Sequence, residues 1–89
     1  MANTIYSCYI VRCSDGSYYC GISNDVTARI LTHNSGRGSK YVKSRLPVVL
    51  VYVEQCGSKS EALRREYQIK QLSRSEKVRL IDMCDKKQA

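Results

Sequence analysis

Residues 5–22 read IYSCYIVRCSDGSYYCGI, and this stretch decides the fold. Its first part, residues 5–13, consists mainly of β-branched and aromatic residues, which favour a strand. Residues 14–17, with the letters SDGS, are typical of a hairpin turn, and residues 18–22 form the returning strand. The stretch therefore predicts a β-hairpin.

The length of the hairpin loop determines whether Tyr9 and Tyr19 lie on the same face of the sheet. Side chains alternate between the two faces along a strand. A two-residue loop would put these tyrosines on opposite faces, whereas a three-residue loop ending at Gly16 pairs Tyr9 with Gly21 and gives the tyrosines a common face. Gly16 suits the left-handed position of such a bulged turn, and Gly21 would leave space beside the Tyr9 ring. A site that contains both tyrosines therefore requires the three-residue loop.

The middle of the chain predicts a helix followed by a basic loop. One of residues 23–25 can cap the helix, Val26 and Ile30 mark its apolar face, and it should end near residues 34–36. The next stretch, which runs to Arg45, is basic and rich in glycine and serine. It indicates a loop with a short helical turn.

A strand and two helices complete the expected fold. The nearly continuous apolar run at residues 48–53 indicates a strand buried on both faces between helices. Ser58 with Glu61, and Ser73 with Glu76, fit the capping box that begins a helix. The side chains that we expect to face inward are Ala62, Leu63, Tyr67 and Ile69 on the first helix and Val78, Ile81 and Met83 on the second, with residues 85–89 frayed.

Length and charge limit the possible functions. A chain of 89 residues has a small core, so we expect a single domain over residues 1–89. The net charge of +7 favours a polyanionic partner, either nucleic acid or an acidic membrane surface. No run approaches the roughly 20 apolar residues of a membrane span, and the N-terminus lacks the pattern of a signal peptide. We expect a cytoplasmic protein, or a nuclear one if its source is eukaryotic or viral.

The cysteines do not form a recognisable metal or disulfide pattern. Their number is odd, and no two have the spacing of a zinc-type pair. We interpret them as reduced thiols that mostly pack in the core, rather than as disulfides or metal ligands. They are Cys8, Cys13, Cys20, Cys56 and Cys84.

Several elements, in order and spacing, resemble the GIY-YIG nuclease superfamily, and most closely its small stand-alone members. The two triplets of that family correspond to residues 7–9 and 19–21. Arg29 and His33 follow on the first helix, and Glu66 follows on a later one. The resemblance covers about residues 5–83, with further matching segments at 15–17, 33–38 and 63–67.

The first triplet departs from the family pattern. Ser7 replaces the usual glycine and Cys8 replaces the usual isoleucine, but the chemistry of the family belongs to the tyrosine, which is present as Tyr9. The resemblance implies a small α/β domain of the α+β type, with a three-stranded antiparallel sheet flanked by helices. This fold agrees with the elements expected above. The resemblance also implies phosphodiester hydrolysis assisted by one divalent metal ion, Mg²⁺ or Mn²⁺.

The resemblance assigns roles to the matching residues. Tyr9 is the candidate general base, and because the pKa of free tyrosine is near 10, positive charge must favour its phenolate. Arg29, the metal ion, or a lysine such as Lys40 or Lys43 can supply that charge. Tyr19 would position water or phosphate by its hydroxyl. The simpler interpretation of each tyrosine is half-buried packing on the sheet with a solvated hydroxyl.

The two helical residues are one turn apart and share a face. Arg29 would clamp the phosphate and stabilise the charge of the transition state, while His33 would relay a proton or orient Tyr9. The simpler interpretation makes Arg29 a solvated surface residue and gives His33 a surface or helix-capping role.

Glu66 is the candidate metal ligand. Its spacing from Ala62 and Ile69 puts it on or beside the buried stripe of its helix, where a carboxylate must be paired or must hold a metal ion. One carboxylate can suffice for Mg²⁺, because this ion keeps several waters and binds substrate phosphate. The alternative is a glutamate paired with a nearby lysine or arginine.

A basic strip follows the first helix. We expect it to bind the DNA backbone in a salt-sensitive manner without reading sequence, with nearby glycines allowing close approach. The alternative is a solubilising basic surface. The residues of this basic strip are Arg37, Lys40, Lys43 and Arg45, and the glycines are Gly36 and Gly38.

Together these features predict a metal-dependent endonuclease that hydrolyses DNA. Since no separate recognition domain is expected, we anticipate low sequence specificity, or selective cutting of branched or single-stranded DNA. The alternatives are a non-catalytic DNA-binding module of the same fold, and a subunit that cuts only when a protein partner positions the substrate. The oligomeric state is left open.

Overall fold

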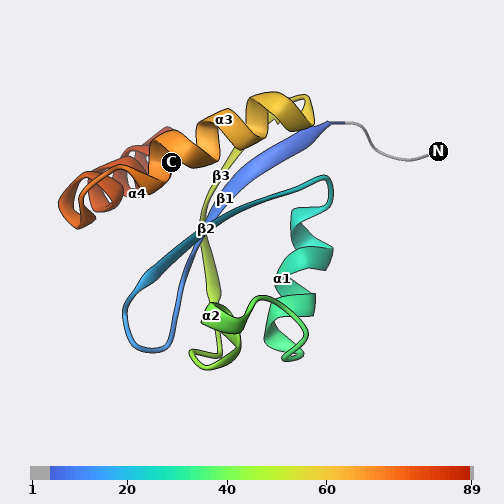
Figure 1. Cartoon of the computed structure of the whole chain (residues 1–89). Helices are drawn as coiled ribbons and strands as arrows, with labels where there is room; N and C mark the ends of the chain where they lie inside the picture. The colour runs from blue at the N-terminus through green and yellow to red at the C-terminus, as the bar shows by residue number, and fades with distance from the viewer. Residues whose placement is uncertain (1–4, 89) are drawn as a thin grey trace.

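The computed structural model describes the backbone of residues 5–88 and the side chains of residues 5–83. In chain order the elements are β1 (Tyr6–Arg12), β2 (Tyr18–Ser23), α1 (Val26–Asn34), α2 (Lys40–Lys43), β3 (Val49–Gly57), α3 (Lys59–Lys70) and α4 (Arg74–Gln88). One sheet lies between two layers of helices, with α1 and α2 on one face and α3 and α4 on the other (Figure 1). The expected α+β architecture is therefore confirmed.

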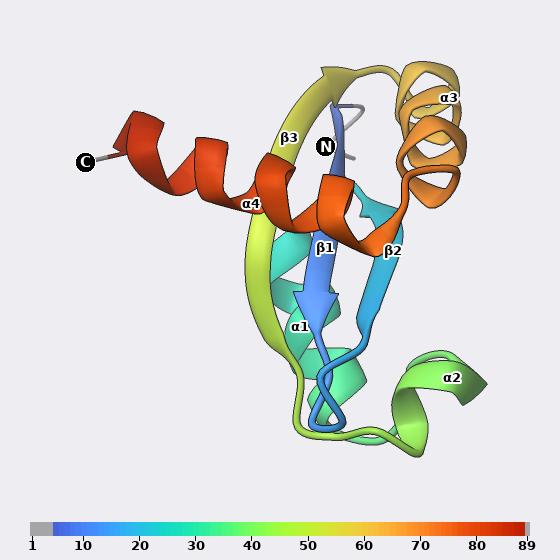
Figure 2. The same ribbon diagram turned by 90° about the vertical axis from the view of Figure 1, so that its left-hand side faces the viewer.

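The sheet is antiparallel and has the strand order β2-β1-β3, so β1 is central and both other strands are edges (Figure 2). Because helices cover both faces of β1, Cys8, Tyr9, Ile10 and Val11 are all at most 1% exposed. Tyr9 and Val11 pack on the side of α1 and α2, whereas Cys8 and Ile10 pack on the side of α3 and α4. The central strand thus separates two small cores.

The hairpin has the three-residue loop that is needed to place Tyr9 and Tyr19 on the same face of the sheet. The backbone N–H of Cys13 donates to the carbonyl oxygen of Ser17 at 2.8 Å, which closes the loop around residues 14–16. Gly16 has a φ of +86°, the left-handed conformation that glycine adopts without a steric cost. The expected role of Gly16 is therefore confirmed.

The resulting register places the two tyrosines on one face. Tyr9 pairs with Gly21, and Val11 pairs with Tyr19. Since residues that pair directly across a ladder point to the same side, Tyr9 and Tyr19 both face α1 and α2. A single site can therefore contain both rings.

The third strand differs from the expectation, because it is not buried on both faces. β3 spans nine residues at the edge of the sheet and pairs only with β1. Val49, Leu50 and Val53 are 53%, 39% and 39% exposed, although Tyr52 is buried. A continuous apolar run cannot distinguish a central strand from an edge strand, because that position depends on which strands pair with it.

Two of the residues expected to face inward on α3 point to solvent instead. Leu63 is 46% exposed and Tyr67 is 68% exposed, whereas Ala62 and Ile69 are fully buried as expected. Leu63 directly follows Ala62, so its side chain points about 100° away around the helix axis. The buried stripe of α3 is therefore narrower than expected.

The last helix also differs in two respects. Met83 is 52% exposed rather than inward, while Ile81 is buried as expected. The helical backbone continues to Gln88 where we expected fraying from residue 85, and Ala89 lies outside the described residues. Within the described part of the chain, no helix combines the length and apolarity needed to cross a membrane.

The expected helix starts are confirmed by their capping bonds. The side chain of Asp25 accepts from the N–H of Ala28 at the start of α1, and Ser58 caps α3. At α4 the box is reciprocal, because the N–H of Ser73 donates to Glu76 Oε1 at 2.9 Å and the N–H of Glu76 donates to Ser73 Oγ at 3.2 Å.

Candidate active site

Tyr9 and His33 share a buried hydrogen bond on the α1 side of the sheet. Tyr9 Oη lies 2.8 Å from His33 Nε2, and the two residues are 1% and 0% exposed. Tyr9 comes from the central strand, and His33 comes from the last turn of α1, the helix that follows the hairpin. The topology therefore joins two residues that are 24 positions apart in the chain.

Two glycines make room for this pair. A Cβ atom on Gly21 would lie 2.6 Å from Tyr9 Oη, and a Cβ atom on Gly38 would lie 2.0 Å from His33 Nδ1. The space that we expected beside Gly21 is confirmed. Gly38 serves a different purpose from the expected approach of DNA, because its open side is filled by the His33 ring.

We expect Gly38→Ala to displace the His33 ring and to lower the free energy of unfolding by about 1–3 kcal/mol, the usual cost of overpacking a buried site. Gly36→Ala is the matched control from the same loop. Gly36 has a φ of +86° but nothing within 4 Å of a new Cβ, so it tests backbone strain without contact.

Denaturant unfolding and the NMR signals of His33, the only histidine of the chain, measure both effects. The imidazole signals should shift in Gly38→Ala and remain in Gly36→Ala. Unchanged His33 signals in Gly38→Ala would contradict this packing.

Arg29 lies beside both members of the hydrogen-bonded pair. Burial raises the pKa of Tyr9, and Arg29 partly offsets this rise through a hydrogen bond and its charge. Burial also lowers the pKa of His33, and the charge of Arg29 lowers it further. At neutral pH the phenol and the imidazole are therefore both uncharged. His33 Nδ1 has no hydrogen-bond partner among the described residues.

The lowered pKa of His33 predicts that the protein becomes less stable as the pH falls below about 6.5, the pKa of an unfolded histidine. In that range the unfolded chain takes up a proton that the native imidazole resists, so unfolding is favoured by up to about 1.4 kcal/mol per pH unit. Urea unfolding between pH 7.5 and 5 checks this against His33→Gln, which should lack the slope. Carboxylates titrate near pH 4 and contribute little in this range. Equal slopes in both proteins would be inconsistent with a buried neutral His33.

Tyr19 extends the pair into a row of rings that reaches the surface. Its ring meets that of His33 edge-on at 5.6 Å between centroids, and it stacks on Tyr41 at 6.0 Å. The guanidinium of Arg45 lies 3.9 Å above the Tyr41 ring. Tyr41 was not among the expected site residues. The signal that could have found it is an aromatic residue between the basic Lys40 and Lys43, a pattern typical of nucleic-acid binding.

Glu66 lies apart from Tyr9 and His33, because its helix, α3, packs on the other face of the sheet (Figure 1). Its carboxylate lies 3.6 Å from Lys70 Nζ, and the side chain is 20% exposed. Its negative charge acts on the thiols of Cys8 and Cys20, so it lies near that side of β2. β2 is an edge strand, and Tyr19 and Lys70 line one hollow of about 310 Å³ beside it. A ligand at this edge can therefore approach groups from both faces.

The basic strip contains three exposed side chains and one that is ion-paired. Arg37, Lys40 and Lys43 are exposed. Arg45 is half-buried and forms an ion pair with Asp15, with 3.0 Å between Arg45 Nε and Asp15 Oδ2. Arg45 thus braces the hairpin loop and the Tyr41 ring, and the other three side chains remain accessible to a polyanion.

The sequence matches a known family. The profile of the GIY-YIG catalytic domain matches residues 5–79. The chain belongs to the GIY-YIG family. Membership places it in a nuclease family and implies DNA binding in general.

Relatives of the same size accompany this GIY-YIG match. A UPF0213 protein of Staphylococcus haemolyticus is 58% identical over 74 residues, which covers 83% of this chain and 90% of the relative. A UPF0213 protein of Staphylococcus aureus strain Mu3 is 59% identical over 73 residues, which covers 82% and 89%. These relatives are thus close to this chain in length.

Two solution NMR structures share the fold. The UPF0213 protein BH0048 of Bacillus halodurans has a TM-score of 0.58 and 44% sequence identity, covering 89% of this chain and 84% of that one. A protein of E. faecalis has a TM-score of 0.62 and 32% identity, covering 93% and 90%. The GIY-YIG fold of this chain therefore has solved counterparts.

Proposed function

We propose that this GIY-YIG protein is a metal-dependent endonuclease that hydrolyses DNA phosphodiester bonds with little sequence specificity. The observation that carries this proposal is the 2.8 Å hydrogen bond between Tyr9 Oη and His33 Nε2, with Arg29 beside both groups. This arrangement provides a proton acceptor, a route for its proton and a cation for phosphate, which are the groups that hydrolysis needs.

The hydroxyl of Tyr9 acts as the general base for the attacking water. To accept a proton from water, Tyr9 must first pass its own proton to His33 Nε2, which lies within hydrogen-bond distance. The imidazole is neutral at neutral pH, and this step assigns its single proton to Nδ1. Burial makes the phenolate costly, since it raises the pKa of Tyr9. Arg29 and the imidazolium that forms at His33 offset that cost by their positive charge.

Arg29 and Tyr19 hold the phosphate. Arg29 is partly exposed, so its guanidinium can bind phosphate oxygens while it stays beside Tyr9. Tyr19 is also partly exposed, and its ring is held between His33 and Tyr41, which fixes the position of its hydroxyl. These two residues orient the phosphate for in-line attack.

Glu66 is the residue that we propose as the ligand of Mg²⁺ or Mn²⁺. Among the described residues, no group of three or more His, Cys, Asp or Glu side chains is placed to hold a metal ion, but Mg²⁺ is commonly bound by one or two carboxylates with waters and phosphate oxygens. The Glu66 carboxylate fits this role, because it is partly exposed and its ion pair to Lys70 is long at 3.6 Å. A bound divalent ion would neutralise charge on the phosphate and on the leaving oxygen.

The exposed cations of the basic strip bind the DNA backbone. Arg37, Lys40 and Lys43 project from the segment that leads from α1 through α2, next to Tyr41. Contacts of this kind recognise phosphate and not base sequence, and they weaken as salt is added. The net charge of +7 acts in the same direction.

The test is cleavage by the purified protein of supercoiled, branched and single-stranded DNA with Mg²⁺, with Mn²⁺ and with EDTA. We expect cutting with either ion, none with EDTA, and full recovery when excess Mg²⁺ is returned. Products should show no common base sequence at the cut. Cutting that persists in EDTA would refute a metal-dependent enzyme.

The burial of Tyr9 favours one alternative, a nuclease that becomes active only when substrate or a protein partner rearranges the site. The hydroxyl that must meet water belongs to a residue that is 1% exposed. DNA binding measured by fluorescence anisotropy, without cleavage under any metal ion, would support this partner-dependent or purely binding protein over the autonomous enzyme.

A further inference from the structure

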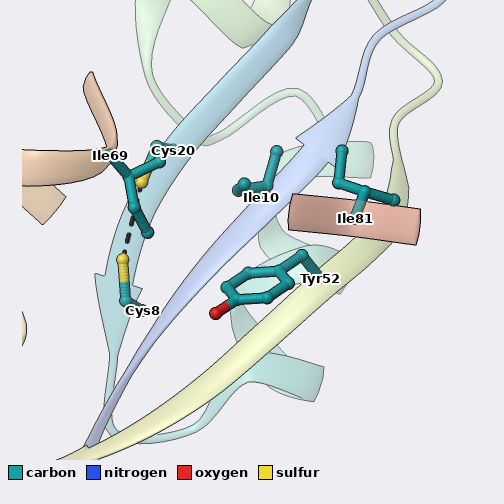
Figure 3. Packing of buried hydrophobic residues seen from close by; sticks show 6 residues of the cluster. All are labelled: Cys8, Ile10, Cys20, Tyr52, Ile69 and Ile81. Carbon is teal, nitrogen blue, oxygen red and sulfur yellow. Dashed lines mark hydrogen bonds between the residues drawn. The ribbon is translucent and has the colours of Figure 1, made fainter. Parts of the chain in front are cut away.

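Two buried cysteines lie in direct contact on the face of the sheet opposite to Tyr9 and Tyr19. Cys8 Sγ and Cys20 Sγ are 3.5 Å apart on the α3 and α4 face of the sheet, packed against Ile69 (Figure 3). They come from the adjacent strands β1 and β2 and are 0% and 6% exposed. Both are free thiols. They are thus already placed as neighbours, and the proposed hydrolysis uses neither of them.

Each of these cysteines is adjacent in sequence to a tyrosine of the candidate site. Cys8 precedes Tyr9, and Cys20 lies between Tyr19 and Gly21. A movement of either cysteine backbone therefore moves a tyrosine on the opposite face of the same strand. Cys8 and Cys20 are the only cysteines of the sequence that adjoin Tyr9 or Tyr19.

Cys20 can be reached from solvent. It lines the hollow of about 310 Å³ at the β2 edge, together with the rings of Tyr18, Tyr19 and Tyr41 and the side chains of Lys70 and Lys77. The hydrogen bond between Cys8 and Cys20 lowers the pKa of the Cys20 thiol, and the charges of Lys70 and Lys77 act in the same direction, against burial and the charge of Glu66. A small oxidant that enters this hollow thus meets Cys20 before Cys8, which is 0% exposed.

We propose that Cys8 and Cys20 are a redox modification site, which a hydroperoxide converts into a disulfide that impairs the nuclease site. In the first step Cys20 Sγ attacks the terminal oxygen of the hydroperoxide, the O–O bond breaks, and an alcohol, or water from hydrogen peroxide, leaves with a proton. Cys20 is then a sulfenic acid. In the second step Cys8 Sγ attacks Cys20 Sγ, the S–O bond breaks, and water leaves with the Cys8 proton. Two thiols are oxidised by two electrons, and one hydroperoxide is reduced.

The disulfide changes the site because it pulls two strands together. The sulfurs must close from 3.5 Å to about 2.05 Å, the length of a disulfide bond. In the register Cys8 pairs with Ile22 and Cys20 pairs with Ile10, so the cysteines are diagonal neighbours and the backbones must shift to join them. This part of the proposal rests on the proposed function, and displacements near 1 Å at a catalytic site cost about 10²-fold in rate.

The other described thiols are less suited to this chemistry. Cys13 packs on the opposite face, with Tyr9 and Val11. Cys56 is on β3 near Cys8, but its sulfur donates to the carbonyl oxygen of Glu54 at 3.5 Å. Cys56 is therefore the competitor that the experiment must separate from Cys20.

The test uses Cys13→Ser, because trypsin cuts after Arg12 and Arg29 and would otherwise leave Cys13 and Cys20 in one peptide. The folded variant is treated with stoichiometric hydrogen peroxide, alkylated under denaturing conditions, digested and analysed by mass spectrometry. We expect peptides 1–12 and 13–29 joined with the loss of two hydrogen atoms, and the link should disappear on reduction. In Cys13→Ser with Cys20→Ala, Cys8 should remain alkylatable.

Two results would overturn the proposal: alkylated Cys8 and Cys20 after treatment that oxidises the other thiols, or Cys8 joined to Cys56. In the second arm we expect the oxidised protein to cut DNA about 10²-fold more slowly than the reduced protein, with recovery on reduction. An unchanged rate in fully cross-linked protein would overturn the effect on the site. If the reduced protein does not cut, the proposed function fails, and peptide mapping still decides the disulfide.

Discussion

Tyr9→Phe should reduce the rate of DNA cleavage by about 10²–10⁴-fold, the usual contribution of a general base. The substitution removes only the hydroxyl, which is the atom that lies 2.8 Å from His33 Nε2. The remaining ring still fills the space over Gly21. We expect the loss of this buried hydrogen bond to cost about 1–3 kcal/mol of stability, because His33 Nε2 is left without its partner.

Tyr52→Phe is the matched control. Tyr52 is also a buried strand tyrosine, 8% exposed, whose hydroxyl donates to Glu54 Oε1, but it packs on the α3 and α4 face. Cleavage is measured under single-turnover conditions, at a temperature where circular dichroism shows both variants folded. We expect Tyr52→Phe to cut at the wild-type rate. Wild-type cleavage by Tyr9→Phe would remove Tyr9 from the mechanism.

Glu66→Gln should slow cleavage by about 10²–10³-fold, the range typical when a group that stabilises transition-state charge is removed. The amide keeps the size of the side chain but loses the negative charge that holds a divalent ion. The side chain is partly exposed and its ion pair with Lys70 is a surface pair, so we expect stability to change by less than about 1 kcal/mol. The slower cleavage should thus come from weaker binding of the metal ion and not from unfolding.

Glu61→Gln on the same helix is the control for Glu66→Gln. Glu61 is exposed and lies in the first turn of α3. Titration of cleavage with Mg²⁺ and Mn²⁺ should show a higher metal requirement in Glu66→Gln and an unchanged one in Glu61→Gln. If the two variants respond to metal ions alike, Glu66 is not the ligand.

The sequence predicted those parts of the fold that depend on neighbouring residues. Parity within 18 residues showed that a three-residue turn at Gly16 would pair Tyr9 with Gly21, and the structure has both this turn and this register. The starts of α3 and α4 followed from Ser58 and Ser73, whose hydroxyls accept bonds from backbone only three residues ahead. Hydrogen bonds of such short range are encoded by the local sequence.

The sequence could not predict the features that depend on remote partners. The exposure of Leu50 and Val53 follows from the edge position of β3, which is set by its pairing with β1. The fit of Gly38 against His33 depends on how the loop after α1 folds back onto its own helix. Contacts of this kind have no local signature, because they depend on three-dimensional proximity and not on sequence spacing.

The sequence by itself determined that Tyr9 and Tyr19 can share a face only through a three-residue loop, that Arg29 and His33 share a helical turn, and that the chain has the GIY-YIG pattern. The first two results follow from the periods of strands and helices, which are properties of the backbone. The third is a resemblance carried by the residue types at 7–9, 19–21, 29, 33 and 66. Only the tertiary structure decided that Tyr9 is hydrogen-bonded to a buried neutral His33, and that α3, the helix of Glu66, packs on the opposite face of the sheet. It also brought Cys8 and Cys20 into contact, because burial, pKa and contact distance depend on which elements pack together.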